Sequence, residues 1–157
     1  ADINTSLPLR DLVMVREFWL RARRSGRDLS AVKHAMGWAM GALLSAEPAA
    51  DRTKLGLHRS LAERIREDYA ADAAALDAEF FEGAPMAEAL SRAVETAAPE
   101  ASPLEAEAHF APEELARLHA WFDLTLTLLD RGDLDWPRTF NGLLKAENAR
   151  RLAAAEG

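Results

Sequence analysis

The sequence contains no cysteine, only one tyrosine and three lysines, and no long apolar run. Without cysteine the chain can form no disulfide scaffold, thiolate metal site or cysteine nucleophile. No apolar run approaches the ~20 residues that a membrane helix needs, and the start lacks the basic-then-apolar layout of a signal peptide. We therefore expect a cytoplasmic protein that does not enter a membrane.

An excess of acidic residues argues against a nucleic-acid partner. There are 26 aspartates and glutamates against 19 lysines and arginines, a net charge of −7. Residues 1–60 hold ten basic against six acidic residues, whereas residues 61–157 hold nine against twenty. An anionic phosphate backbone or lipid surface would be repelled by this balance. The two parts of opposite charge could attract one another, within one chain or between copies.

Composition predicts an all-α fold. Alanine, the best helix former, occupies 33 of the 157 positions, and strand-like alternation of β-branched residues is missing. Arginine outnumbers lysine 16 to 3, which together with the alanine excess is typical of a GC-rich bacterial genome. We expect a bacterial protein built as a compact helical bundle.

Helix start and stop residues predict six to seven helices. In the first half, Ser6 and Gly26 bound a helix over 9–24, Asp28 or Ser30 begins a second that ends at Glu47-Pro48, and Asp51 begins a third. Further on, the helices are predicted to start at Pro85, Pro112 and Asp135, with one short turn after the capping box Ser102–Glu105. Residues 1–157 are expected to form one domain, with a linker at 97–103 before the C-terminal helical pair, 112–155.

The predicted third helix, over about 52–81, is the longest and carries one apolar stripe. At about 30 residues it would be about 45 Å long. A stripe of this kind often forms the seam of a dimer. The leading hypothesis is therefore a non-enzymatic protein–protein interaction or adaptor protein, which we expect to be a homodimer. The stripe consists of Leu57, Leu61, Ile65, Tyr69, Leu76 and Phe80.

Two glycines inside the second helix support an alternative function. Gly37 and Gly41 lie four apart, and each costs a helix interior up to about 1 kcal/mol relative to alanine. They can be spacers that let a second helix approach closely. They can also form the floor of a cleft walled by Trp38, Met36 and Met40, which would bind a flat small molecule or an anion.

Basic side chains near this cleft support the alternative function of binding a small molecule or an anion. Four arginines at 21, 23, 24 and 27 form the most basic cluster, and guanidinium groups suit phosphates and acidic protein surfaces. The ordinary interpretation is that they compensate the helix dipole. The candidate ligand-binding residues are Arg21, Arg24, His34 and Trp38. A weaker hypothesis treats residues 28–37 as part of a helix-turn-helix regulator.

The histidines give only weak candidates for metal-dependent chemistry. Neither His-Glu-x-x-His nor paired Glu-x-x-His occurs, but His119 and Asp123 lie four apart on one helix face. An ion pair at this spacing is the more ordinary interpretation. Gly-x-Ser-x-Gly and the glycine-rich phosphate loops are also absent from the sequence. We expect no catalytic residue and no cofactor, with a metal-dependent helical enzyme as a lesser alternative.

Overall fold

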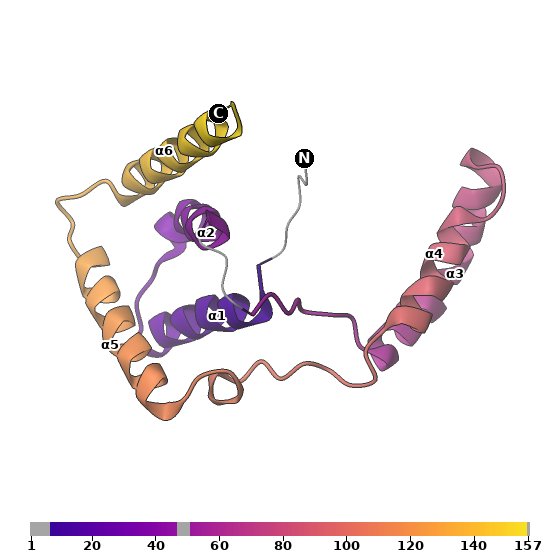
Figure 1. Ribbon diagram of the computed structural model, residues 1–157, viewed down its shortest axis with the longest axis horizontal. Helices are drawn as coiled ribbons and strands as arrows, with labels where there is room; N and C mark the ends of the chain where they lie inside the picture. The colour runs from indigo at the N-terminus through magenta and orange to yellow at the C-terminus, as the bar shows by residue number, and fades with distance from the viewer. Residues whose placement is uncertain (1–6, 47–50, 157) are drawn as a thin grey trace. The chain divides into compact units, whose positions relative to one another are not determined.

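The computed structural model describes residues 7–46 and 51–156, and its regular structure there is helical (Figure 1). These two ranges contain no β-strand and only two isolated β-bridges. The all-α prediction is confirmed, and the number of helices falls in the predicted range. The elements are α1 (Leu9–Arg24), α2 (Ser30–Ala46), α3 (Arg59–Phe80), α4 (Pro85–Thr96), the 3-10 turn η1 (Ala106–Ala108), α5 (Pro112–Leu129) and α6 (Trp136–Glu156).

The chain divides into two compact units. The first unit comprises residues 1–54 and 104–157, and the second comprises residues 55–103. The segment 97–103, expected as a linker, ends the second unit, where Ala97 is buried and Ala98 forms two backbone hydrogen bonds. The organisation into one domain stays a prediction.

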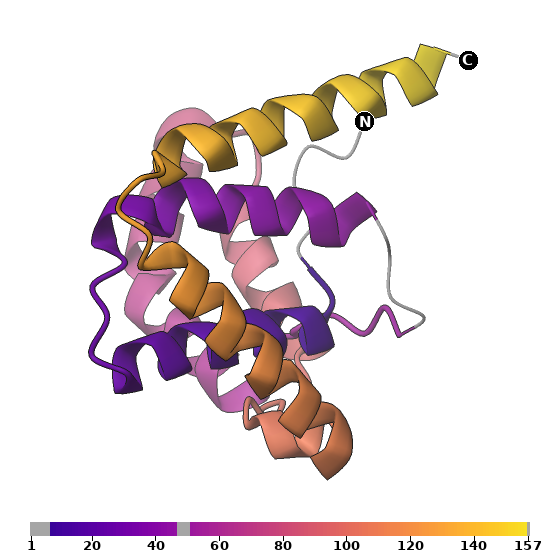
Figure 2. The same ribbon diagram turned by 90° about the vertical axis from the view of Figure 1, so that its left-hand side faces the viewer.

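The main core of the first unit lies where α1, α2 and α5 meet. Phe18 and Leu126 are almost fully buried there, and the rings of Phe18 and Phe122 meet edge to face at 5.4 Å between centroids. Such edge-to-face aromatic pairs are favourable beyond the apolar area they bury. Figure 2 shows α5 crossing α1, with α2 and α6 lying side by side. These contacts place α2 between the core and α6.

A smaller cluster fixes the start of α1. Leu9 and Val13 pack against Ala106 and Phe110, which follow each other closely around η1. The Arg10 guanidinium also lies 4.8 Å from the centre of the Phe110 ring, a cation–π contact. Residues 104–110 are therefore part of the first unit.

Several helix ends lie where the sequence predicts them. Gly26 follows α1 with φ +74°, a left-handed conformation that glycine adopts at little cost. Asp135 caps α6 by accepting a hydrogen bond from the Arg138 amide at 3.1 Å. Ser6 and the pair Glu47-Pro48 lie outside the described residues.

The third helix begins later than predicted, at Arg59 rather than at residue 52. The Asp51 side chain accepts a hydrogen bond from the Thr53 amide at 2.8 Å, which makes a turn and not a helix start. The Thr53 carbonyl accepts from the Leu9 amide, and the Leu57 carbonyl from the Ala98 amide. Because these groups bond to distant segments, residues 51–58 stay out of the helix. The α3 helix has 22 residues, so it is about 33 Å long.

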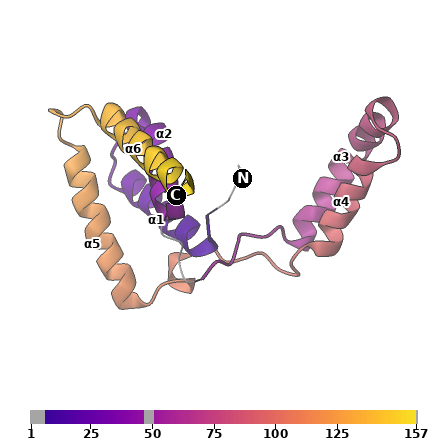
Figure 3. The ribbon, with the colours of Figure 1, turned by 45° about the horizontal axis from the view of Figure 1, so that its top comes forward.

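The second unit is a hairpin of α3 and α4, which lie side by side (Figure 3). Asp77 of α3 is buried, and its carboxylate accepts hydrogen bonds from the amides of Met86 and Ala87 at 2.9 and 3.0 Å. This side chain caps α4 from the neighbouring helix. Gly83, with φ +91°, allows the turn between them.

Among the helices of the described residues, none has the length and apolar content required to cross a bilayer.

Candidate functional site

A cavity of the first unit lies between α2 and α6. Its volume is about 860 Å³, which is within the range of small-molecule sites, and it opens to solvent. Figure 2 shows that α2 and α6 run side by side in the same direction. The lining residues are Leu7, Ser30, Lys33, His34, Gly37, Trp38, Gly41, Ala42, Ser45, Leu144, Asn148 and Arg151.

The α2 helix presents two different faces. Val32, Met36 and Ala39 recur at helical spacing and are buried in the first unit. The opposite face carries the lining residues, which recur every three or four positions from Ser30 to Ser45. One helix therefore supplies both a core stripe and most of the cavity wall.

Trp38 stands on this wall with its indole 60% exposed, in spite of being a large apolar side chain. Its Nε1 donates a hydrogen bond to His34 Nε2 at 3.1 Å, and the two rings meet edge to face. His34 Nε2 is the acceptor of this bond, because an indole N–H can only donate. The structure thus brings together two of the predicted ligand-binding residues, with His34 orienting Trp38.

The glycines do not act as spacers. A Cβ atom placed at Gly37 or at Gly41 would meet no atom within 4 Å apart from its own neighbours in the helix. The interpretation that they permit close approach of another helix is therefore wrong. Both glycines line the cavity beside Trp38, as the alternative interpretation expected, whereas Met36 is buried in the core and Met40 packs against that core.

The cavity lining contains basic nitrogen groups and no carboxylate among its described residues. Lys33 is exposed near the start of α2, and no ion pair to it is found within the described ranges. Arg151 reaches the cavity from α6 and donates a hydrogen bond to the Ala42 carbonyl, which joins α6 to α2. Lys33 and Ala42 lie nine positions apart on α2, about 14 Å along the helix axis, so the two basic side chains meet α2 at different points.

Glu147 holds Arg151 in place. Its buried carboxylate accepts hydrogen bonds from Arg150 and Arg151 at 2.9 to 3.0 Å. These two guanidinium groups lower the pKa of Glu147 from 4.5 to about 2. Since this carboxylate balances part of the charge of Arg151, Lys33 is the more available cation for a ligand.

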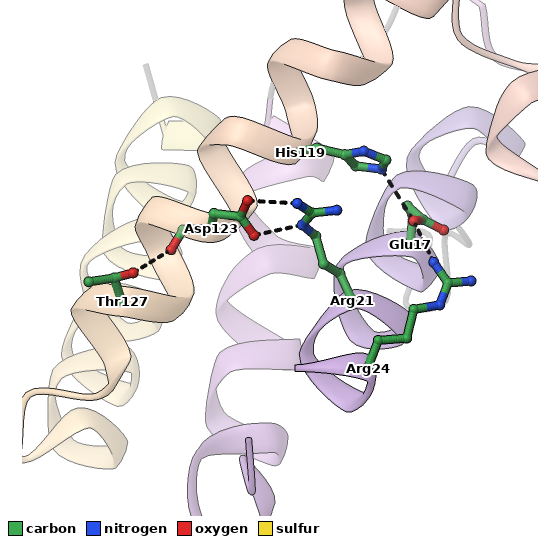
Figure 4. A network of polar contacts seen from close by, with 6 residues as sticks. All are labelled: Glu17, Arg21, Arg24, His119, Asp123 and Thr127. Carbon is green, nitrogen blue, oxygen red and sulfur yellow. Dashed lines mark hydrogen bonds and ion pairs between the residues drawn. The ribbon is translucent and has the colours of Figure 1, made fainter. Parts of the chain in front are cut away.

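The other predicted ligand-binding residues, Arg21 and Arg24, lie in a different place. Arg21 forms a two-point ion pair with Asp123, with both nitrogen–oxygen distances at 2.6 Å (Figure 4). This pairing lowers the pKa of Asp123 and raises that of Arg21. Arg24 approaches Glu17 at 3.5 Å. Arg21 therefore joins α1 to α5, whereas Arg24 pairs within α1, and neither arginine lines the cavity.

His119 and Asp123 do not converge on one point. Asp123 is occupied by Arg21, while His119 Nε2 lies 3.2 Å from the buried Glu17 carboxylate, close enough for an ion pair but without hydrogen-bond geometry (Figure 4). In the part of the chain that is described, no three histidine or carboxylate side chains form a group able to hold a metal ion.

Sequence reasoning missed the α6 side of the cavity. Leu144, Asn148 and Arg151 lie at spacings of four and three, so they share one helix face, and that spacing is visible in the sequence. What the sequence does not reveal is that this face lies against α2, about a hundred residues away.

Comparison of the chain with family models, with curated proteins and with solved structures finds no match.

Proposed function

We propose that this protein binds a small organic anion with a flat apolar part in the cavity between α2 and α6. The observation that carries the proposal is the composition of the lining, where an exposed tryptophan and two uncovered glycines stand beside basic groups and no carboxylate. A flat ring can lie over Gly37 and Gly41 against Trp38. Its acidic group then reaches Lys33.

Titration with a matched pair of probes tests this function. The acid 2-naphthoate and its neutral amide have the same shape, so a cationic site should bind the acid much more tightly. The expected signal is a change in tryptophan fluorescence that is lost in the Trp38→Phe variant. Equal binding of acid and amide, or an unchanged signal in Trp38→Phe, contradicts the proposal.

Substitution of Lys33 tests the electrostatic part. Lys33→Gln removes a charge-assisted contact and should weaken binding of 2-naphthoate by about tenfold, since such contacts contribute about 1.5–3 kcal/mol. Lys145→Gln is the matched control, because Lys145 lies on α6 but does not line the cavity. An equal loss in both variants would show that only net charge matters.

A protein–protein interaction role is the second candidate function. Both helices of the second unit carry large exposed apolar side chains, including Tyr69 and Phe80 on α3 and Met86 on α4. Exposed apolar surface of this kind often marks a site for another protein. This role requires a surface and no ligand, so it is independent of the cavity.

A further inference from the structure

The α3–α4 hairpin buries little apolar surface of its own. Residues 55–103 are all described, and the buried ones are three alanines and Asp77. In the first unit, by contrast, Phe18 and Leu126 are almost fully buried. A unit of this size without a core of large side chains depends on further contacts for its stability.

Large apolar side chains form a stripe along α3, which we call the α3 stripe, and of its members only Ile65 is half-buried, the others being exposed. Its members recur at spacings of four and seven, so they share one side of the helix. The α4 helix covers the adjoining face, which carries Ala62, Ala73 and Asp77. The stripe keeps Tyr69 56% and Phe80 64% exposed. It consists of Leu61, Ile65, Tyr69, Leu76 and Phe80.

Charge is distributed unequally along the same helix. Residues 59–66 contain three arginines and one glutamate, whereas residues 67–80 contain five acidic residues and no basic one. Two α3 helices placed antiparallel would bring each basic end beside an acidic end. A parallel pair would bring like charges together, which is unfavourable.

We propose that the α3 stripe packs antiparallel against the α3 stripe of a second copy of this chain. Two hairpins joined in this way form a four-helix bundle, the architecture in which such stripes are covered. The apolar stripe supplies the driving force, and the charge distribution sets the direction. This inference concerns the second unit and does not depend on the cavity between α2 and α6.

Single cysteines test the direction, because the natural chain has none. Leu61 and Phe80 lie near opposite ends of α3, so an antiparallel pair places each beside the other. Under mild oxidation, Leu61→Cys and Phe80→Cys should remain uncrosslinked alone and form a disulfide-linked dimer when mixed. Crosslinking within each variant alone, and not in the mixture, would overturn the antiparallel arrangement.

The oligomeric state tests whether a second copy is the partner. Light scattering at tens of micromolar should give a dimer for the natural chain, and Leu76→Glu should raise its dissociation constant by about tenfold or more, since it places a charge in the apolar contact. Leu128→Glu, a similarly exposed leucine on α5, should leave the dimer intact. Circular dichroism checks that each variant keeps its helix content. A monomeric natural chain overturns the proposal, as does equal weakening by both substitutions.

Discussion

At the scale of single residues, charged side chains stabilise the helices of this protein by contacts that reach a neighbouring helix. Asp77 accepts two amide hydrogen bonds from the start of α4, and Arg21 joins α1 to α5 through Asp123. A carboxylate beside unpaired amides at a helix start satisfies donors that the helix itself cannot. These residues therefore fix helix positions and take no part in the proposed ligand site.

Replacing Asp77 should destabilise the hairpin. Asp77→Ala leaves the amides of Met86 and Ala87 without their acceptor, which should cost about 1–2 kcal/mol of unfolding free energy. Asp77→Asn keeps one acceptor oxygen and should lose less. Urea unfolding followed by circular dichroism measures the difference. Asp72→Ala, at an exposed position of the same helix, serves as the control, and an equal loss there would contradict the role of Asp77.

At the scale of elements, α2 has one face packed in the core and an opposite face that lines the cavity. On the cavity face, two glycines lower the stability of the helix and leave open space beside it. Gly37 and Gly41 lie in the helix interior, where glycine is unfavourable, and no neighbouring atom requires them. A ligand that occupies the space above Gly37 and Gly41 would explain why the helix keeps these two glycines in spite of their cost in stability. Under the proposed function, the ligand site and not helix packing accounts for the two glycines.

Alanine substitutions separate the two explanations. Gly37→Ala and Gly41→Ala should each raise the free energy of unfolding, by up to about 1 kcal/mol, because alanine favours helix and the added methyl meets no atom. The same methyl groups should weaken binding of 2-naphthoate. Gly142→Ala on α6, also unobstructed but outside the cavity, should stabilise without any effect on binding. Destabilisation at Gly37 would restore the spacer interpretation.

At the scale of the whole molecule, acid should weaken the first unit. The pKa of Glu147 is lowered from 4.5 to about 2, and that of Asp123 is also lowered, so both carboxylates bind protons more readily when unfolded. Their contribution to stability is therefore complete above about pH 4.5 and is lost as the pH falls towards 2. Burial raises the pKa of Asp11, which acts in the opposite direction.

Unfolding measured between pH 7 and pH 2 tests this behaviour. Glu147→Gln keeps the shape of the side chain without its charge, so it should be less stable than the natural chain at pH 7. The difference should shrink below pH 4.5 and become small near pH 2, where Glu147 is half protonated in the folded chain. A difference that stays constant over this range would show that the ion pairs with Arg150 and Arg151 do not cause it.

The sequence by itself determined the all-α class and most helix boundaries, because proline, glycine and capping residues act locally on the backbone. Gly26, Pro85, Pro112 and Asp135 bound helices as predicted. It also singled out Gly37, Trp38 and Gly41, since glycine is unusual inside a helix.

Only the tertiary structure decided what depends on contacts across the chain. Hydrogen bonds from the amides of Leu9 and Ala98 keep residues 51–58 out of α3. No local sequence pattern predicts these bonds. Arg21 pairs with Asp123 and does not line the candidate site. Lys33 and Arg151 line the same cavity because α6 lies along α2. Residue spacing shows which side chains share one face of a helix, but the packing of the whole unit determines which other helix contacts that face.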